Sequence, residues 1–146
     1  MIVQYQLKRE EEAENSAKTY NGKVVVVCDR SIIDPAAYIG MDSLDKVLSE
    51  FDISFEQALK RYNLVIHLET AAKGASDFYT LENNNARSEN INEAISIDDK
   101  LLSVWSRHPR RYIIDNNGKN FEQKIECMEK IIIEYLQVDQ KQRDIR

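Results

Sequence analysis

The chain has 146 residues, a length that suits one domain, and its 42% hydrophobic and 31% charged residues exclude a disordered chain. A formal net charge of −5 disfavours a protein that coats nucleic acid, and no stretch approaches the roughly 20 apolar residues of a membrane span. The two cysteines, Cys28 and Cys127, lack metal-type spacing, and no secretory pattern opens the sequence. We therefore expect a cytoplasmic protein with neither nucleic-acid nor membrane partners.

The first part of the chain predicts a helix, a strand and further helices. A charged helix is expected over residues 1–20, ended by Asn21-Gly22. Residues 23–28 carry four consecutive valines, which are stiff at χ1 and favour a strand, and their unbroken apolar run predicts burial on both faces. A short helix is expected from Pro35, a second over residues 42–51, and a third from the capping box at residues 54–57.

The second part repeats the alternation of strand and helix. Residues 64–68 predict a strand in which His67 is a satisfied sheet histidine, and residues 77–90 predict a loop or short helix. A helix over residues 91–107, a strand over 111–114 and a helix from 120 follow. Three strands that alternate with helices indicate an α/β fold with a parallel sheet.

Polar residues follow each predicted strand, at residues 29–31, 69–70 and 115–116. Chemistry in parallel sheets lies at the carboxyl ends of the strands. Asp29 beside Arg30 suits a site for magnesium and phosphate, because a carboxylate binds the metal and a guanidinium grips phosphate oxygens. The alternative is that Asp29 only ends the strand and caps the next turn.

Arg87 lies in the polar segment after the second predicted strand, where an arginine could close over a transferring phosphoryl group or lie on a solvated face. The phosphate loop G-x-x-x-x-G-K-[ST] is not found in the sequence. Gly22-Lys23 and Gly118-Lys119 lack both the following hydroxyl residue and the earlier glycine.

Three runs, residues 24–38, 62–87 and 105–115, together resemble kinase-like P-loop ATPases. The family is that of the AAA-domain ATP-binding proteins grouped with nicotinamide riboside kinases, and the resemblance covers residues 1–137. It implies a three-layer parallel sheet of the P-loop NTPase type in one domain, residues 1–146. This sequence departs from the family because it lacks the first strand and the Walker A phosphate loop, as in a domain truncated at its N-terminus.

The resemblance also implies roles for individual residues. Asp29 would be the Walker-B-like acid that holds Mg²⁺, Arg30 the arginine beside the phosphates, and Arg87 the lid arginine. Asp115 and Asn116, in the loop of residues 115–118, would lie near the adenine. The implied cofactors are Mg²⁺ and ATP, provided that the phosphate loop is supplied, and the implied partner is a nucleotide or a small phosphorylated molecule.

Because the central strand of the family is absent from the sequence, several structures remain possible. We expect either a closed-up sheet, in which the first two predicted strands pair directly, or a homodimer through the open sheet edge; the third reading is a truncated chain. The resemblance implies a nucleotide-binding domain fragment that, if active, acts as an ATP-dependent phosphotransferase or ATPase, and we expect this chain alone to be inactive. The alternatives are a phosphate binder without hydrolysis, a degenerate NTPase relic and a non-catalytic protein-interaction module.

Overall fold

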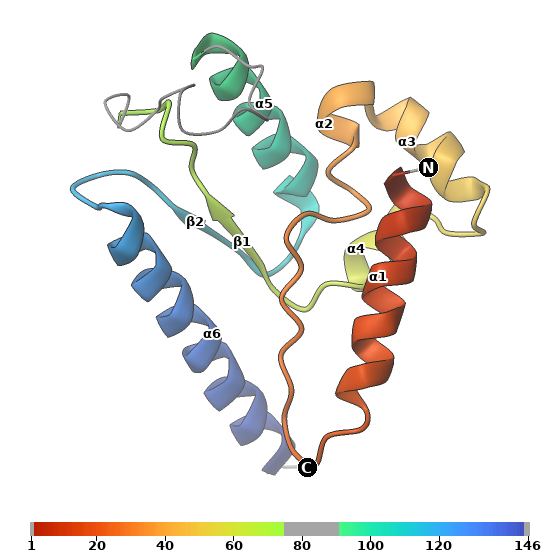
Figure 1. Cartoon of the computed structure of the whole chain (residues 1–146), viewed down its shortest axis with the longest axis vertical. Helices are drawn as coiled ribbons and strands as arrows, with labels where there is room; N and C mark the ends of the chain where they lie inside the picture. The colour runs from red at the N-terminus through yellow and green to blue at the C-terminus, as the bar shows by residue number, and fades with distance from the viewer. Residues whose placement is uncertain (1, 75–90, 145–146) are drawn as a thin grey trace. The chain divides into compact units, whose positions relative to one another are not determined.

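The computed structural model describes residues 2–74 and 91–144, with the backbone alone for residues 139–144. The chain divides into two compact units. The first unit comprises residues 1–63 and 100–108, and the second comprises residues 64–99 and 109–146. Figure 1 shows the order of the helices and strands along the chain.

The first unit is helical in its described residues. It contains α1 (Ile2–Ala17), α2 (Ala36–Ile39), α3 (Met41–Ser49), α4 (Phe55–Lys60) and the short 3₁₀ helix η2 (Trp105–Arg107). These confirm the predicted helices. The capping box before α4 is also confirmed, because the Gln57 N–H donates to Ser54 Oγ (3.2 Å) and the Ser54 N–H donates to Gln57 Oε1 (2.7 Å).

The core of the first unit forms where α2, α3 and α4 turn their apolar faces inward. Ile32, Ile33, Leu44 and Leu48 are completely buried. Trp105 of η2 is 6% exposed and packs edge-on against Tyr62, with ring centroids 5.3 Å apart. Ile32 and Ile33, which follow Arg30 closely in the chain, are therefore anchored in the centre of this core.

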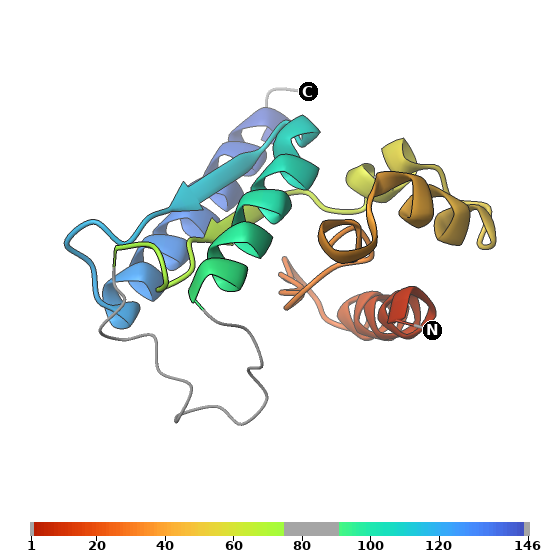
Figure 2. The same cartoon turned by 90° about the horizontal axis from the view of Figure 1, so that it is seen from above.

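The second unit contains a parallel two-stranded sheet, β1 (Val65–Leu68) and β2 (Arg111–Ile114). Val65 lies opposite Arg111 and Leu68 opposite Ile114, so both strands end at the same edge. Helix α5 (Ile91–Val104), which begins in this unit, and α6 (Phe121–Asp144) flank the strands in Figures 1 and 2. The predicted α/β class with a parallel sheet is confirmed. Among the described residues, no helix has the length and hydropathy needed to cross a bilayer.

The prediction of a buried strand at residues 23–28 is wrong. The sheet of the described residues contains only β1 and β2, and residues 23–28 form no strand, so the predicted count of three strands is wrong as well. The direct pairing of residues 23–28 with residues 64–68 stays a prediction. The four valines at positions 24–27 are between 38% and 69% exposed. The physical reason is that a strand needs a neighbour for its backbone hydrogen bonds, and the intrinsic preference of valine does not supply one.

Candidate functional site

Asp29 and Arg30 lie side by side in an exposed turn of the first unit. Neither the Asp29 carboxylate nor the Arg30 guanidinium makes an ion pair or hydrogen bond with any described residue. Arg30 has a φ of +73°, in the left-handed region that non-glycine residues rarely adopt. A strained backbone of this kind persists only where its surroundings fix it, and such strain concentrates at binding sites.

Hydrogen bonds on both sides of Arg30 hold its backbone in this conformation. On one side, Gln6 of α1 donates a hydrogen bond to the Arg30 carbonyl oxygen (3.1 Å). On the other side, the buried Ser31 hydroxyl accepts from the backbone N–H groups of Ile33 and Asp34 (3.1 Å each) and donates to the Asp34 carboxylate (2.9 Å). The exposed pair of charges therefore lies on a well-anchored backbone.

A buried polar network stabilises the chain just after this turn. The hydroxyl of Tyr62 accepts from the Ile32 N–H (3.0 Å) and donates to Glu10 (2.8 Å). Glu10 is 4% exposed, and Arg61 donates to it through Nε (3.2 Å) and Nη2 (3.0 Å). Burial, followed by the nearby Glu10 carboxylate, raises the pKa of Tyr62, so its hydroxyl keeps its proton and remains a donor.

The residues present fit magnesium bound together with phosphates better than a metal held by protein alone. In the part of the chain that the structure describes, no three His, Cys, Asp or Glu side chains gather into a metal-binding cluster. Mg²⁺ is commonly held by one or two carboxylates, with water and substrate phosphates completing its six ligands. The exposed Asp29 carboxylate meets this requirement, because none of the described residues occupies its oxygens.

A second polar cluster joins the ends of β1 and β2 in the second unit. The side-chain amide of Asn116 donates to the carbonyl oxygens of Thr70 and Lys73 (2.7 Å each). The backbone N–H of Asn116 also donates to the Glu69 carboxylate (3.3 Å). Two of the polar segments that follow predicted strands, residues 69–70 and 115–116, thus lie together, and the Asn116 amide links the two loops.

Lys124 of α6 completes this link. Its ammonium donates to the Glu69 carbonyl oxygen (2.6 Å) and to Asn116 Oδ1 (2.8 Å), and the residue is 6% exposed. Burial lowers the pKa of Lys124, and the carboxylates of Glu69, Asp98 and Asp115 partly offset that effect. A buried cation therefore holds the loop after β2 against the loop after β1.

Asp98 of α5 is the second buried charge of this cluster. It accepts hydrogen bonds from His67 Nε2 (2.9 Å), the Thr70 N–H (3.1 Å) and Lys73 Nζ (2.7 Å), and it is 5% exposed. Burial alone would raise the pKa of Asp98, but the hydrogen bonds from His67 and Lys73 outweigh it and lower the pKa to about 2. His67 is thus a satisfied sheet histidine, as predicted.

Comparison with known proteins indicates the family to which the chain belongs. Residues 1–124 match the family model described as an AAA domain. The chain belongs to this family. The match indicates a nucleotide-binding domain of P-loop-like type, in agreement with the resemblance noted in the sequence. No curated protein and no solved structure gives a significant match.

The structure places the predicted residues of this AAA domain in different parts of the chain. Asp29 and Arg30 belong to the first unit, and Asp115 and Asn116 belong to the second. Arg87 lies outside the described residues. The roles of these five residues in binding remain predictions.

Sequence reasoning missed Asp98 and Lys124, although a signal for each was present. Asp98 occupies a helical stripe with Ala94, Leu101 and Trp105, and Lys124 precedes Met128 on the inner stripe of α6. A charged residue within an apolar helical stripe is buried only if it finds partners. Both charges could therefore have been predicted to enter a polar network.

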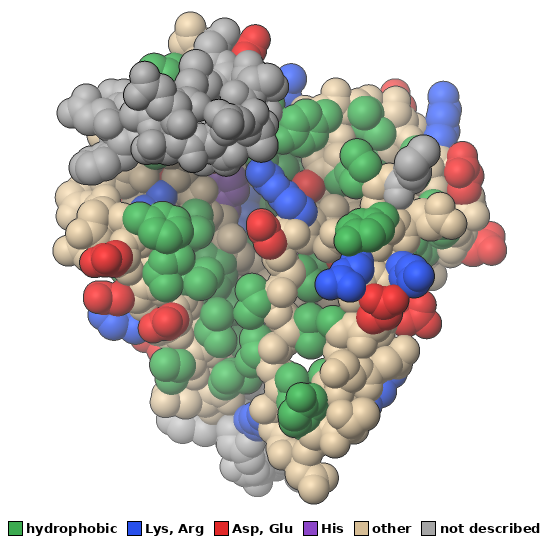
Figure 3. Space-filling model, viewed as in Figure 1, with side chains coloured by type: hydrophobic (Ala, Val, Ile, Leu, Met, Phe, Trp, Pro, Cys, Tyr) green, Lys and Arg blue, Asp and Glu red, His purple; other side chains and the backbone are tan. Residues whose placement is uncertain are grey.

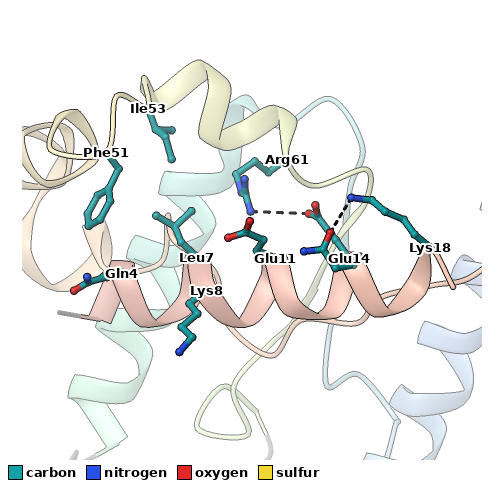
Figure 4. A pocket seen from close by; sticks show the side chains of 10 residues that line it. Gln4, Leu7, Lys8, Glu11, Glu14, Lys18, Phe51, Ile53 and Arg61 are labelled. Carbon is teal, nitrogen blue, oxygen red and sulfur yellow. Dashed lines mark hydrogen bonds and ion pairs between the residues drawn. The ribbon is translucent and has the colours of Figure 1, made fainter.

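A groove of about 530 Å³ lies along α1 in the first unit, and sequence reasoning did not predict it. Figure 4 shows Leu7, Phe51 and Ile53 toward one end and Arg61 near Glu14 farther along, with Arg61 Nη2 3.9 Å from Glu14 Oε1. Its lining residues are Gln4, Leu7, Lys8, Glu11, Glu14, Asn15, Lys18, Phe51, Ile53 and Arg61. Both acidic and basic side chains line the groove, so it lacks the single sign of charge that would attract phosphate.

Proposed function

We propose that this AAA domain binds magnesium-bound ATP through Asp29 and Arg30. Asp29 contributes a carboxylate oxygen to Mg²⁺, and Arg30 contacts a phosphate group. The proposal includes the finer parts of the resemblance: a kinase-like relation, a three-layer sheet of the P-loop type, and a Walker-B-like role for Asp29. The observation that carries it is an adjacent carboxylate and guanidinium, both exposed and unpaired among the described residues, on an anchored turn of a chain in a nucleotide-binding family.

The chemistry of the pair supports this assignment. The Asp29 carboxylate and the Arg30 guanidinium are both exposed and have no partner among the described residues, so both charges are available to a ligand. A guanidinium presents a planar fork that matches two phosphate oxygens, and Mg²⁺ bridges a carboxylate to phosphate oxygens. When bound, Mg²⁺ would neutralise charge on the phosphates. Arg87 is proposed as a further phosphate contact, on the family resemblance alone.

The loop of residues 115–118 is proposed to contact the base. Both amide hydrogens of Asn116 are directed to backbone carbonyls, and its oxygen accepts from Lys124. Asn116 would therefore act by positioning this loop. The Asp115 carboxylate pairs with Lys119 (2.6 Å), and the hydrogen bond from Lys119 lowers the pKa of Asp115. Asp115 thus remains an acceptor for an amino group at neutral pH.

Amide chemical shifts of the 146-residue chain, titrated with ATP in the presence and absence of Mg²⁺, test the proposal. We expect weak binding, with a dissociation constant on the order of 1 mM, because the sequence contains no phosphate-loop motif. Shifts at residues 29–31 should require Mg²⁺. Asp29→Asn should weaken binding of the magnesium complex by about tenfold, equivalent to about 1.4 kcal/mol.

Asp45→Asn is the matched control, because Asp45 is an exposed aspartate of α3 in the same unit. It should bind the magnesium complex as the unmodified chain does. Equal affinities of the Asp29 and Asp45 variants, or identical shifts with and without the metal, would contradict the assignment.

A second candidate is a protein-interaction module. The exposure of four consecutive valines at positions 24–27 favours it, because such a run is costly to leave in water. This candidate does not require nucleotide binding, and its partner can be argued separately.

A further inference from the structure

The segment of residues 24–28 exposes both its apolar side chains and its backbone. Val24 and Val26 are 44% and 38% exposed, and Val25 and Val27 are 45% and 69% exposed. Since successive side chains of an extended segment point to opposite faces, both faces of the segment are partly exposed. Figure 3, viewed as in Figure 1, shows hydrophobic side chains at the surface along this segment.

The backbone of this segment has hydrogen-bonding capacity to spare. Among the described residues of the first unit, none bonds to the backbone N–H or carbonyl groups of residues 24–28. Proteins usually protect such an edge with a charge, a proline or a bulge, and the run from 24 to 28 contains neither charge nor proline. A β-rich, uncharged run with open backbone groups is suited to pairing with another extended chain.

We propose that residues 23–29 pair with the same segment of a second copy of the chain as an antiparallel β-ladder centred on Val26. In this register Val26 faces Val26 of the second copy across the two-fold axis, and Val25 faces Val27. Lys23 then lies opposite Asp29 of the second copy, and the pair occurs twice by symmetry.

The pattern of charges selects this arrangement over its alternatives. A shift by one residue places Val24 opposite Val27, and then Lys23 faces Cys28 and Asp29 faces Gly22, so both ionic pairs are lost. Parallel in-register pairing brings the two Lys23 side chains together and the two Asp29 side chains together, which is repulsive. The order Lys, four valines, Cys, Asp therefore complements itself only when the second copy runs antiparallel with Val26 at the centre.

Cysteine cross-linking tests the register without disrupting the fold. In a Cys28→Ser background, Val26→Cys places two thiols directly opposite each other. The Cα atoms of directly opposed residues then lie within the range that a disulfide spans, about 4.4–6.8 Å. Val25→Cys is the matched control, since each new thiol then faces Val27 and the two thiols are diagonal, about 7–8 Å apart. Under a mild oxidant, the Val26→Cys chain should form a covalent dimer much faster than the Val25→Cys chain. Equal rates would overturn the register.

Light scattering after gel filtration tests the assembly itself, in EDTA so that no metal competes for Asp29. The unmodified chain should form dimers that dissociate on dilution. Val26→Lys should abolish dimerisation, whereas Val138→Lys, at a comparably exposed valine (55%) of α6, should not. A monomer at every concentration, open-ended aggregates, or equal loss in both variants would overturn the proposal.

Charge reversal provides an independent check on the ionic pairs. Lys23→Asp alone should weaken the dimer by placing two acids together, and adding Asp29→Lys should restore it. Failure of the double variant to recover would contradict the pairing of these two residues. Nucleotide binding could fail while the dimer forms, so the two proposals are separable.

Discussion

The substitution Asp98→Asn tests the polar cluster at the ends of β1 and β2 most sharply. Asp98 is 5% exposed and accepts from His67, Lys73 and the Thr70 N–H. Its pKa of about 2 compares with an ordinary aspartate value of about 3.9, a difference equivalent to about 2.5 kcal/mol. We therefore expect Asp98→Asn to lower the free energy of unfolding by about 2–3 kcal/mol at neutral pH.

Asp99→Asn is the matched control. Asp99 is the next residue and pairs with the same Lys73 (2.5 Å), but its side chain is 63% exposed. Exposed ion pairs contribute little, so its loss should cost less than about 1 kcal/mol. Both variants remove a carboxylate charge that pairs with Lys73, so the contrast between them measures what burial and the additional hydrogen bonds from His67 and the Thr70 N–H contribute at Asp98.

Urea unfolding followed by far-ultraviolet circular dichroism measures the free energy of unfolding of both variants. Repeating the measurement at several pH values gives a second test. Because the pKa of Asp98 is lower in the folded chain than in the unfolded chain, its contribution is complete above about pH 4 and is lost as the pH falls toward 2. The unmodified chain and Asp98→Asn should therefore converge in acid. Equal stabilities of the Asp98 and Asp99 variants at neutral pH, or a gap between the unmodified chain and Asp98→Asn that does not shrink in acid, would refute the reasoning.

Three further predictions concern stability, each measured by the same urea unfolding. Lys124→Met should cost about 2–4 kcal/mol, because it removes a buried ammonium that donates to two partly buried oxygens, whereas Lys130→Met on the exposed face of α6 should be near neutral; similar costs would contradict the role of the buried ammonium. Ser54→Ala should cost about 1 kcal/mol through loss of the cap of α4, and an unchanged midpoint would exclude it. Trp105→Phe should cost about 1.5 kcal/mol or more, since it removes the indole donor to Asp34 (2.8 Å), and a neutral result would show that this bond adds nothing.

The helices and the two paired strands follow from local signals in the sequence. The capping box at Ser54 and the apolar runs at residues 64–68 and 111–114 each specify structure through neighbouring residues, and each appears as predicted. The valine segment shows the limit of such reasoning. Its residues favour an extended chain, but pairing within the chain depends on a partner strand elsewhere in the sequence, which the propensity of these residues does not specify.

The candidate site was predictable in part for a similar reason. Parallel strands end at one edge, so the meeting of residues 69–70 with residues 115–116 follows from topology. The network around Asp98 and Lys124 depends instead on which helical positions face the strands, which is a matter of packing. The left-handed conformation of Arg30 likewise depends on contacts from α1 and from the buried serine that follows it. No glycine and no turn motif at this position predicts the left-handed conformation of Arg30.

Paramagnetic broadening with Mn²⁺–ATP tests most directly whether this AAA domain carries a metal–nucleotide site at Asp29. Mn²⁺ takes the place of Mg²⁺ at oxygen ligands and broadens the signals of nearby amides. The account predicts that the amide signals of residues 29–31 weaken when Mn²⁺–ATP replaces Mg²⁺–ATP, and that Asp29→Asn removes the effect. Unchanged signals at these residues, or broadening confined to other parts of the chain, would contradict it.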